Sequence, residues 1–202
     1  MTVPTSALVE LLEEFDPDVI SQLRNAHPMA SRMLSRGMIL GAEDGDGKVI
    51  PALKDLVEQG LRVAQGRATS TWKQLDHRVR RVMRVRLAGG LLSTMASAGV
   101  VGALVLAQGA AALTTAVLAF ASSALVLVAQ YLEDGGGHSE RSPRGAKDNV
   151  SRIVAELSTL DGELRLFSVT QPDQEAWENL TRRANALVSE LKRIEFDFGI
   201  RS

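Results

Sequence analysis

Outside one long apolar stretch, hydrophobic residues recur along the chain at helical spacing. The first segment places four large apolar residues on one helical face: Leu8, Leu11, Leu12 and Phe15. Asp16 followed by Pro17 is typical of an N-cap with a first-turn proline, so a second helix is expected to begin there. The polar residues 41–48 fit neither P-loop nor EF-hand spacing and are interpreted as a solvated turn. Residues 1–50 are therefore predicted to form short helices that end in a polar loop.

Three later segments carry narrow apolar seams with spacings of three and four residues, which favour packing against another helix. One seam lies in an amphipathic helix over residues 51–86. The other two predict a coiled-coil-like helical hairpin over residues 147–202, in which Pro172 and Asp173 separate the helices. Packing within one chain is the simpler interpretation, and pairing between subunits is the alternative. The seam residues are Trp72, Leu75, Val79 and Val82 in the first helix, and Trp177, Leu180, Leu187, Leu191 and Ile194 in the last.

Residues 87–132 contain no charged residue and no histidine over 46 positions. Their two arms, residues 87–107 and 110–132, are 21 and 23 residues long. A helix needs about 20 residues to cross the hydrocarbon of a bilayer. The pattern therefore predicts an all-α protein with a two-helix transmembrane hairpin over residues 87–132 and the lipid bilayer as a partner.

Basic residues precede this hairpin, and basic residues favour the cytoplasmic side of a membrane. An even number of spans places both ends of the chain on that side. We therefore expect localisation in the bacterial inner membrane with both termini cytoplasmic, and a flexible linker over residues 133–146. The basic residues predicted to meet the membrane surface are Arg78, Arg80, Arg81, Arg84 and Arg86.

Both arms of the hairpin carry small residues at four-residue spacing, which lets helix backbones approach closely. Packing within the hairpin is one interpretation, and contact between copies in a homo-oligomer is another. The residues predicted to pack are Gly90, Thr94, Ala98 and Gly102 in the first arm, and Ala111, Thr115, Ala119 and Ser123 in the second. The residues predicted to line a weakly polar pore are Ser93, Ser97 and Ser122.

Composition and charge remove several classes of function. The formal net charge is -1, cysteine is absent, and the chain has three histidines. The lack of cysteine excludes disulfide frameworks and Cys-ligated metal sites. Near-neutral charge argues against bulk nucleic-acid binding, and no pattern places a nucleophile beside a base. We therefore expect no enzyme activity, no cofactor, no metal and no nucleic-acid partner.

The order of elements over residues 70–168 resembles the SLATT group of bacterial two-span membrane proteins. The resemblance rests on the segment TWKQLDHRVRRVMRVR, the paired small-residue arms that follow it, and the later helix NVSRIVAELSTLDGELRLF. It implies a pore-forming effector of a bacterial conflict system, which responds to a nucleotide signal or a partner sensor by damaging the inner membrane.

Three functions follow from these patterns. The first is an oligomerising pore-forming or membrane-disrupting effector, controlled by its cytoplasmic helices and a protein sensor. The second is a non-catalytic membrane-anchored scaffold that binds a protein partner. The third is a soluble helical assembly protein, in which the apolar hairpin is buried in an oligomer.

Overall fold

The structure is a computed structural model of the 202-residue chain. It describes residues 3–28, 34, 39–40, 49–105, 117, 120–124, 126–128, 142–170 and 173–200, with the backbone alone at 3–4, 39–40, 49 and 92–105. The described residues are helical apart from one short strand pair, which confirms the all-α prediction. The chain divides into unit 1, residues 1–72 and 149–202, and unit 2, residues 73–148.

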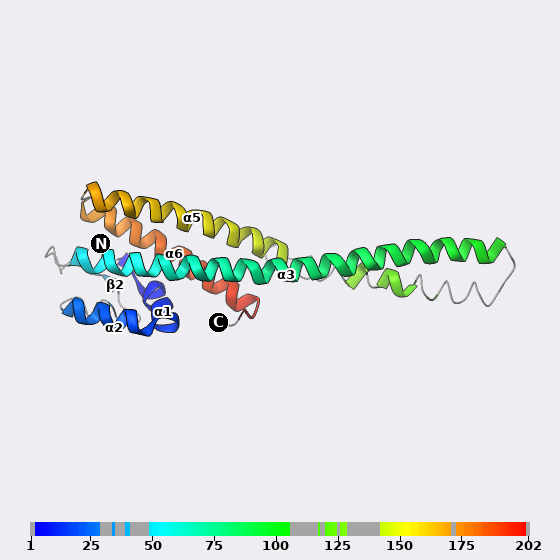
Figure 1. The fold of residues 1–202 in the computed structure, drawn as a ribbon, viewed down its shortest axis with the longest axis horizontal. Helices are drawn as coiled ribbons and strands as arrows, with labels where there is room; N and C mark the ends of the chain where they lie inside the picture. The colour runs from blue at the N-terminus through cyan, green and yellow to red at the C-terminus, as the bar shows by residue number, and fades with distance from the viewer. Residues whose placement is uncertain are drawn as a thin grey trace. The chain divides into compact units, whose positions relative to one another are not determined.

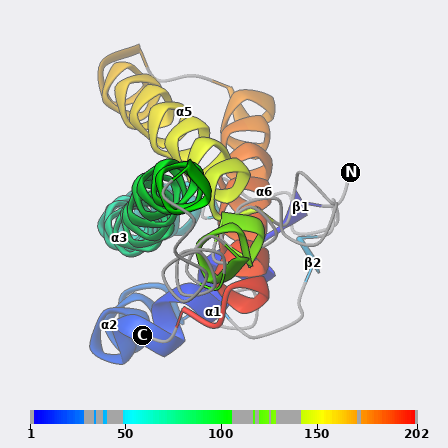
Figure 2. The same ribbon diagram turned by 90° about the vertical axis from the view of Figure 1, so that its right-hand side faces the viewer.

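Unit 1 is a helical assembly built around the first part of one long helix. Its elements are α1 (Ser6–Phe15), α2 (Pro17–Ala26), the start of α3 (Val49–Val105), most of α5 (Pro143–Thr170) and α6 (Gln174–Asp197). Two short strands, β1 (Val3–Pro4) and β2 (Ile39–Leu40), pair antiparallel. Within this unit, α1 and α2 lie on one side of α3 and α5 lies on the other (Figures 1 and 2).

Two of the predicted boundaries differ from the structure. The helix predicted over residues 51–86 continues as α3 to Val105, through the Gly89–Gly90 pair and without a proline after residue 86. The helix α5 begins at Pro143, inside the predicted linker 133–146. A proline suits the first turn of a helix, where its missing N–H is not needed. The predicted turn at residues 41–48 lies outside the described residues.

The membrane prediction is corrected by the structure. No helix in the described part of the chain combines the length and the apolar content that crossing a membrane requires. The two-span hairpin is therefore unsupported, and the assignment to the bacterial inner membrane with both termini cytoplasmic is wrong. The prediction relied on the absence of charge. However, 25 of the 46 residues in this stretch are Ala, Gly, Ser or Thr, so its hydrophobicity is only moderate.

The core of unit 1 consists of apolar side chains at the spacing read from the sequence. In α5 and α6 these side chains point away from solvent, and each helix buries one narrow face. Such burial stabilises by roughly 1.5–3 kcal/mol per large side chain. The buried residues include Val150, Ile153, Leu157, Leu160 and Leu164 in α5, and Trp177, Leu180, Leu187, Leu191 and Ile194 in α6.

A glycine of α3 leaves space for a leucine side chain of α1. A Cβ atom built on Gly60 would lie 2.6 Å from Cδ2 of Leu8, a side chain with no solvent exposure. Ala64 and Ala68 continue the same four-residue row along α3 and are also fully buried. The Leu8 side chain therefore occupies the space above Gly60, and a larger residue there would require that side chain to move.

The N-terminus of α1 is capped from another helix. Thr5 occupies its N-cap position, but the Thr5 hydroxyl makes no capping bond and has no hydrogen-bond partner among the described residues. Instead, Oδ1 of Asn185 in α6 accepts from the backbone N–H groups of Ala7 (2.8 Å) and Leu8 (3.3 Å). These are two of the four amide donors that a helix start leaves without a partner.

Local caps define two other helix starts, as the sequence predicts. The carboxylate of Asp16 accepts from the backbone N–H of Val19 at the start of α2, and that of Asp173 accepts from Ala176 at the start of α6. The N-cap predicted at Asp16 is confirmed, and Asp173 lies at the predicted break before the last helix. The helix α6 ends at Asp197, and Gly199, two residues later, has a φ of 56°, in the left-handed region that glycine adopts without strain.

A buried ion pair connects α3, α6 and α1. The guanidinium of Arg67 lies 3.1 Å from Oε1 of Glu195 and covers the ring of Phe15, 4.1 Å from its centroid. The hydroxyl of Thr71 donates to the same carboxylate at 2.6 Å. Removing one partner would leave the other charge buried without compensation, so the pair fixes the relative position of the three helices.

We expect Gly60→Ala to destabilise unit 1, because the new methyl group collides with the buried Leu8 side chain. The free energy of unfolding should fall by about 1–3 kcal/mol, in spite of the higher helix propensity of alanine. Gly66→Ala is the matched control, since a Cβ there would meet no described atom within 4 Å. It should raise stability by about 0.5–1 kcal/mol. Urea unfolding followed by circular dichroism measures both, and equal effects would contradict the close approach.

We expect Asn185→Ala to lower the free energy of unfolding by about 1–3 kcal/mol, because two buried amide groups of α1 lose their acceptor. Asn179→Ala is the control, since Asn179 is an exposed asparagine in the same helix. Its effect should stay within about 0.5 kcal/mol. Hydrogen exchange of the Ala7 and Leu8 amides should accelerate in the first variant only. Unchanged exchange there would contradict the cap.

Candidate interaction surface

Unit 2 begins with a basic stretch of α3. Residues 73–86 carry six basic side chains and a single acid, Asp76. Leu75 is fully buried, whereas most of the charged side chains in this stretch are exposed. The exposed arginines include all five that the sequence assigned to a membrane surface: Arg78, Arg80, Arg81, Arg84 and Arg86.

Asp76 lies at the centre of a small charge cluster within unit 2. Its Oδ1 accepts a hydrogen bond from Nζ of Lys147 at 2.7 Å, and its Oδ2 lies 2.6 Å from Nε of Arg80, one turn along α3. The hydrogen bond from Lys147 is the main cause that holds the pKa of Asp76 below its ordinary value of 3.8, and the charges of Arg80 and Lys147 act in the same direction. One carboxylate therefore faces two cations.

An apolar row begins among the arginines of α3 and continues beyond them. Met83, Leu87 and Leu91 occur at four-residue spacing, so they share one face of the helix. Met83 is 55% exposed, Leu87 63% and Leu91 67%. Large apolar side chains exposed in a continuous row are unusual on an isolated protein and mark sites of interaction.

Later residues of the charge-free stretch expose apolar side chains as well. Phe120 is 78% exposed, and three aliphatic residues around it are more than half exposed. They are Val117, Leu127 and Val128. The charge-free segment therefore presents large apolar surface in both of its described parts.

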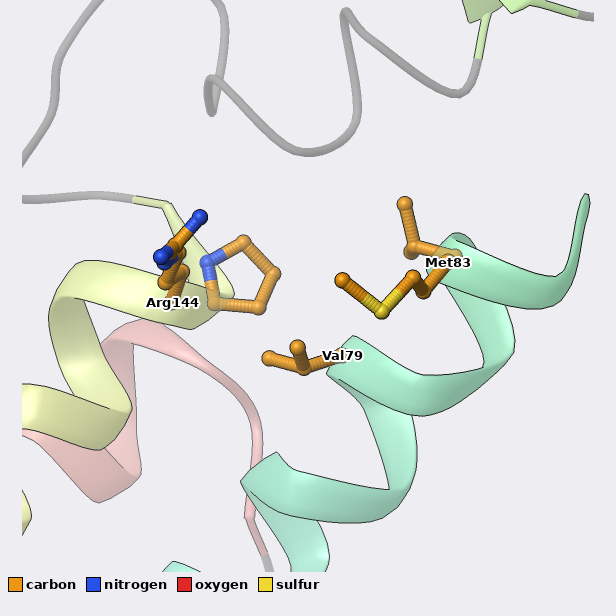
Figure 3. Close-up of a pocket in the computed structure, with 5 residues that line it drawn as sticks. Val79, Met83 and Arg144 are labelled. Atoms are coloured by element: carbon orange, nitrogen blue, oxygen red, sulfur yellow. The ribbon is translucent and has the colours of Figure 1, made fainter. Parts of the chain in front are cut away.

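A small hollow borders the apolar row within unit 2. Its walls are Val79, Val82 and Met83 of α3 and Pro143 and Arg144 of α5. Figure 3 shows Val79 and Met83 projecting from α3 toward the side where Arg144 lies. The cavity volume is about 40 Å³, whereas pockets for small organic ligands and cofactors usually measure about 300–1,000 Å³. The hollow fits the tip of a side chain, not a cofactor.

The predicted α3 seam contributes to both units. Trp72 is half-buried, and its indole Nε1–H donates to Oγ of Ser151 in α5 at 2.9 Å. Leu75 is fully buried. Val79 and Val82 are half-buried and line the hollow, whereas the predicted seam would have packed them fully against another helix.

The residues predicted for span packing and pore lining are only partly described. Gly90 is half-buried, Ser122 is buried and Ser123 is exposed. Ser93, Thr94, Ser97, Ala98 and Gly102 lie in α3, where only the backbone is described. Ala111, Thr115 and Ala119 lie outside the described residues. Their predicted roles stay predictions.

The sequence reasoning missed the partners of Asp76. The pairing with Arg80 has a local signal, because an acid four residues before a base forms an ion pair on a helix. Lys147 is 71 residues away in sequence, and nothing local indicates the contact. The Arg67–Glu195 pair was missed for the same reason.

Among the described residues, no group of three or more histidine, cysteine or acidic side chains would hold a metal ion. Nε2 of His27 lies 2.8 Å from Oδ2 of Asp55, and this pair fastens the end of α2 to α3. No match to this chain was found among protein-family models, curated proteins or solved structures.

We expect the stabilising effect of Asp76 to depend on pH. Because the folded state lowers its pKa, the stabilisation is complete above 3.8 and is lost as the pH falls through the lower folded-state pKa. Asp76→Asn should therefore lower the melting temperature at neutral pH, and the difference from the unmodified protein should shrink in acid. Asp148→Asn, an exposed acid of the same unit, is the control. A difference that does not change with pH would contradict the assignment.

Proposed function

We propose that the chain is a non-catalytic assembly protein that self-associates through residues 87–132. The observation that carries the proposal is the exposure of large apolar side chains within a segment that has no charge. Leu91 and Phe120 are both more than 60% exposed, and they lie in the two described parts of this segment. Exposed apolar surface of this kind favours burial against another protein surface.

Stable self-association requires the burial of more than one such side chain. Burying one large apolar side chain contributes about 1.5–3 kcal/mol, whereas association costs about 4–15 kcal/mol in lost translational and rotational freedom. An interface that uses both described parts of the segment supplies several large side chains from each copy. The segment as a whole, rather than one row, is therefore the proposed interface.

The sequence of the segment supports helix-to-helix packing between copies. The four-residue row of Gly90, Thr94, Ala98 and Gly102 consists of small side chains, which let two helices approach closely. Self-association also agrees with the homo-oligomer predicted from the same row. In this proposal the segment is buried in the assembly, and unit 1 is the helical body that each copy carries.

The membrane-dependent functions lose their basis. Pore formation, membrane disruption and a membrane-anchored scaffold all depend on the inner-membrane placement that the structure corrects. The resemblance to the SLATT group rests on the order of elements, and it stays a prediction. A protein sensor as a partner also stays a prediction.

We expect Phe120→Arg to reduce self-association, because it places a charge in the proposed interface. Light scattering coupled to size-exclusion chromatography should give an oligomeric mass for the unmodified protein and a smaller mass for this variant. Phe196→Arg is the matched control, since Phe196 is 86% exposed but lies in unit 1 at the end of α6. The control should keep the oligomeric mass.

Three outcomes would contradict the proposal. One is a monomeric mass for the unmodified protein over the micromolar range. Another is an equal loss of association in both phenylalanine variants, which would indicate non-specific aggregation through exposed rings. The third is a protein that leaves the particulate fraction of the cell only with detergent.

A further inference from the structure

The helix α5 carries a second row of residues on the face opposite its buried one. At about 100° per residue, this row lies across the helix from the buried Ile153, Leu157 and Leu164. Its members are all exposed, and α5 lies at the edge of unit 1 (Figures 1 and 2). We name the row the outer seam, and it consists of Ala155, Thr159, Gly162, Leu166 and Val169.

The outer seam has the character of a covered surface. The face of a surface helix that points away from the core usually carries charged and polar residues, whereas the outer seam contains no charge. Leu166 is 63% exposed and Val169 81%. The hydroxyl of Thr159 donates to the backbone carbonyl of Ala155 at 3.1 Å. Covering the seam would therefore leave no side-chain donor of its own without a partner.

Gly162 has no role in the packing of unit 1. A Cβ atom built there would meet no described atom within 4 Å, whereas at Gly60 it would meet Leu8. Glycine inside a helix is less stable than alanine, so an exposed helical glycine without a packing role weakens α5. The missing side chain does, however, let a second helix approach this face closely. Gly162 therefore marks the centre of a helix-to-helix contact.

The order of residue sizes along the outer seam selects a second copy of α5. The small residues precede Gly162, and the two large ones follow it. In an antiparallel pair centred on Gly162, Leu166 of one copy faces Thr159 of the other, and Val169 faces Ala155. A parallel pair would bring large residues against large ones and leave the small ones apart. Matching large to small residues fills the space between two helices, and only the antiparallel pair does so.

The charges beside the seam are compatible with this orientation. On one flank, Arg165 is 2.9 Å from Asp161 of its own helix, and its side chain is 81% exposed. An antiparallel pair reverses the order of these two residues, so the cation of each copy approaches the acid of the other. On the other flank, Glu163 of each copy approaches its counterpart. Arg183 of α6 lies 2.8 Å from Glu163 and offsets this repulsion.

We propose that α5 pairs with α5 of a second copy in antiparallel orientation through the outer seam. The contact goes beyond the proposed self-association, because it lies in unit 1 and uses none of residues 87–132. Each copy contributes only two large apolar side chains, so the contact is weak between separate molecules. It is populated at the high local concentration of an assembled protein. In this respect the proposal rests on the proposed function.

Disulfide cross-linking of the full-length protein tests the pairing, because the chain has no cysteine of its own. Ala155→Cys and Val169→Cys are prepared separately, mixed and oxidised. The mixture should give a covalent dimer, and each variant alone should not. In the antiparallel pair, residue 155 lies about 21 Å along the helix from residue 155 of the other copy. A disulfide requires Cα atoms within about 7 Å.

Two matched controls make the test specific. Ser168→Cys mixed with Ala155→Cys should cross-link far less, because Ser168 is exposed beside Val169 but lies about 100° round the helix from it. Leu166→Glu, added to both cysteine proteins, should lower the yield of the mixed dimer about fivefold or more, since it buries a charge in the seam. Phe196→Glu, an equally exposed apolar position on α6, should leave the yield unchanged. Circular dichroism checks that each variant is folded.

The pairing is overturned if each cysteine variant cross-links with itself as well as in the mixture, which indicates parallel helices, or if Ser168→Cys gives the same yield as Val169→Cys. Light scattering on the same samples separates this result from self-association through residues 87–132. An oligomeric mass without the mixed dimer would overturn the outer-seam contact alone. A monomeric mass, with the mixed dimer still formed at raised protein concentration, would overturn the self-association alone.

Discussion

The packing of Leu8 of α1 over Gly60 of α3 is one constraint on unit 1. A side chain at this position would occupy the space of Leu8, which is fully buried. The same helix makes aromatic and polar contacts with its neighbours: its Phe15 ring lies against Arg67 of α3, and its first turn reaches Asn185 of α6. Apolar and polar contacts therefore act together where α1 meets α3 and α6.

The polar contacts of unit 1 determine which arrangement the helices adopt. An apolar seam alone allows helices to slide or rotate with little change in buried area, since the hydrophobic effect is not directional. The Asn185 cap and the Arg67–Glu195 pair are directional, and each connects residues on different helices. A shift of one turn would leave buried amide and charged groups without partners, at a cost of several kcal/mol.

The sequence predicts those parts of the structure whose causes are local. The caps at Asp16 and Asp173 act within three residues, and the seam of α6 follows from its own spacing. The contacts of Asn185 with Leu8 and of Lys147 with Asp76 span 177 and 71 residues, so no local pattern reveals them. In the candidate site, the basic and apolar positions were visible in the sequence. Their membrane interpretation was wrong, because the absence of charge was read as sufficient for a span.

A charge-free helical segment can be buried in lipid or in protein, and its flanks help to distinguish the two. Arginines that only met lipid headgroups would need no acid among them. Here the single acid of the basic stretch is held by Lys147, a residue of another helix, which gives part of the basic stretch a structural role within unit 2. Arg80 shares that carboxylate, so its orientation is fixed one turn before the exposed row of Met83 and Leu87. An oriented cation beside an apolar row is a feature of protein recognition, where the position of charge selects the partner.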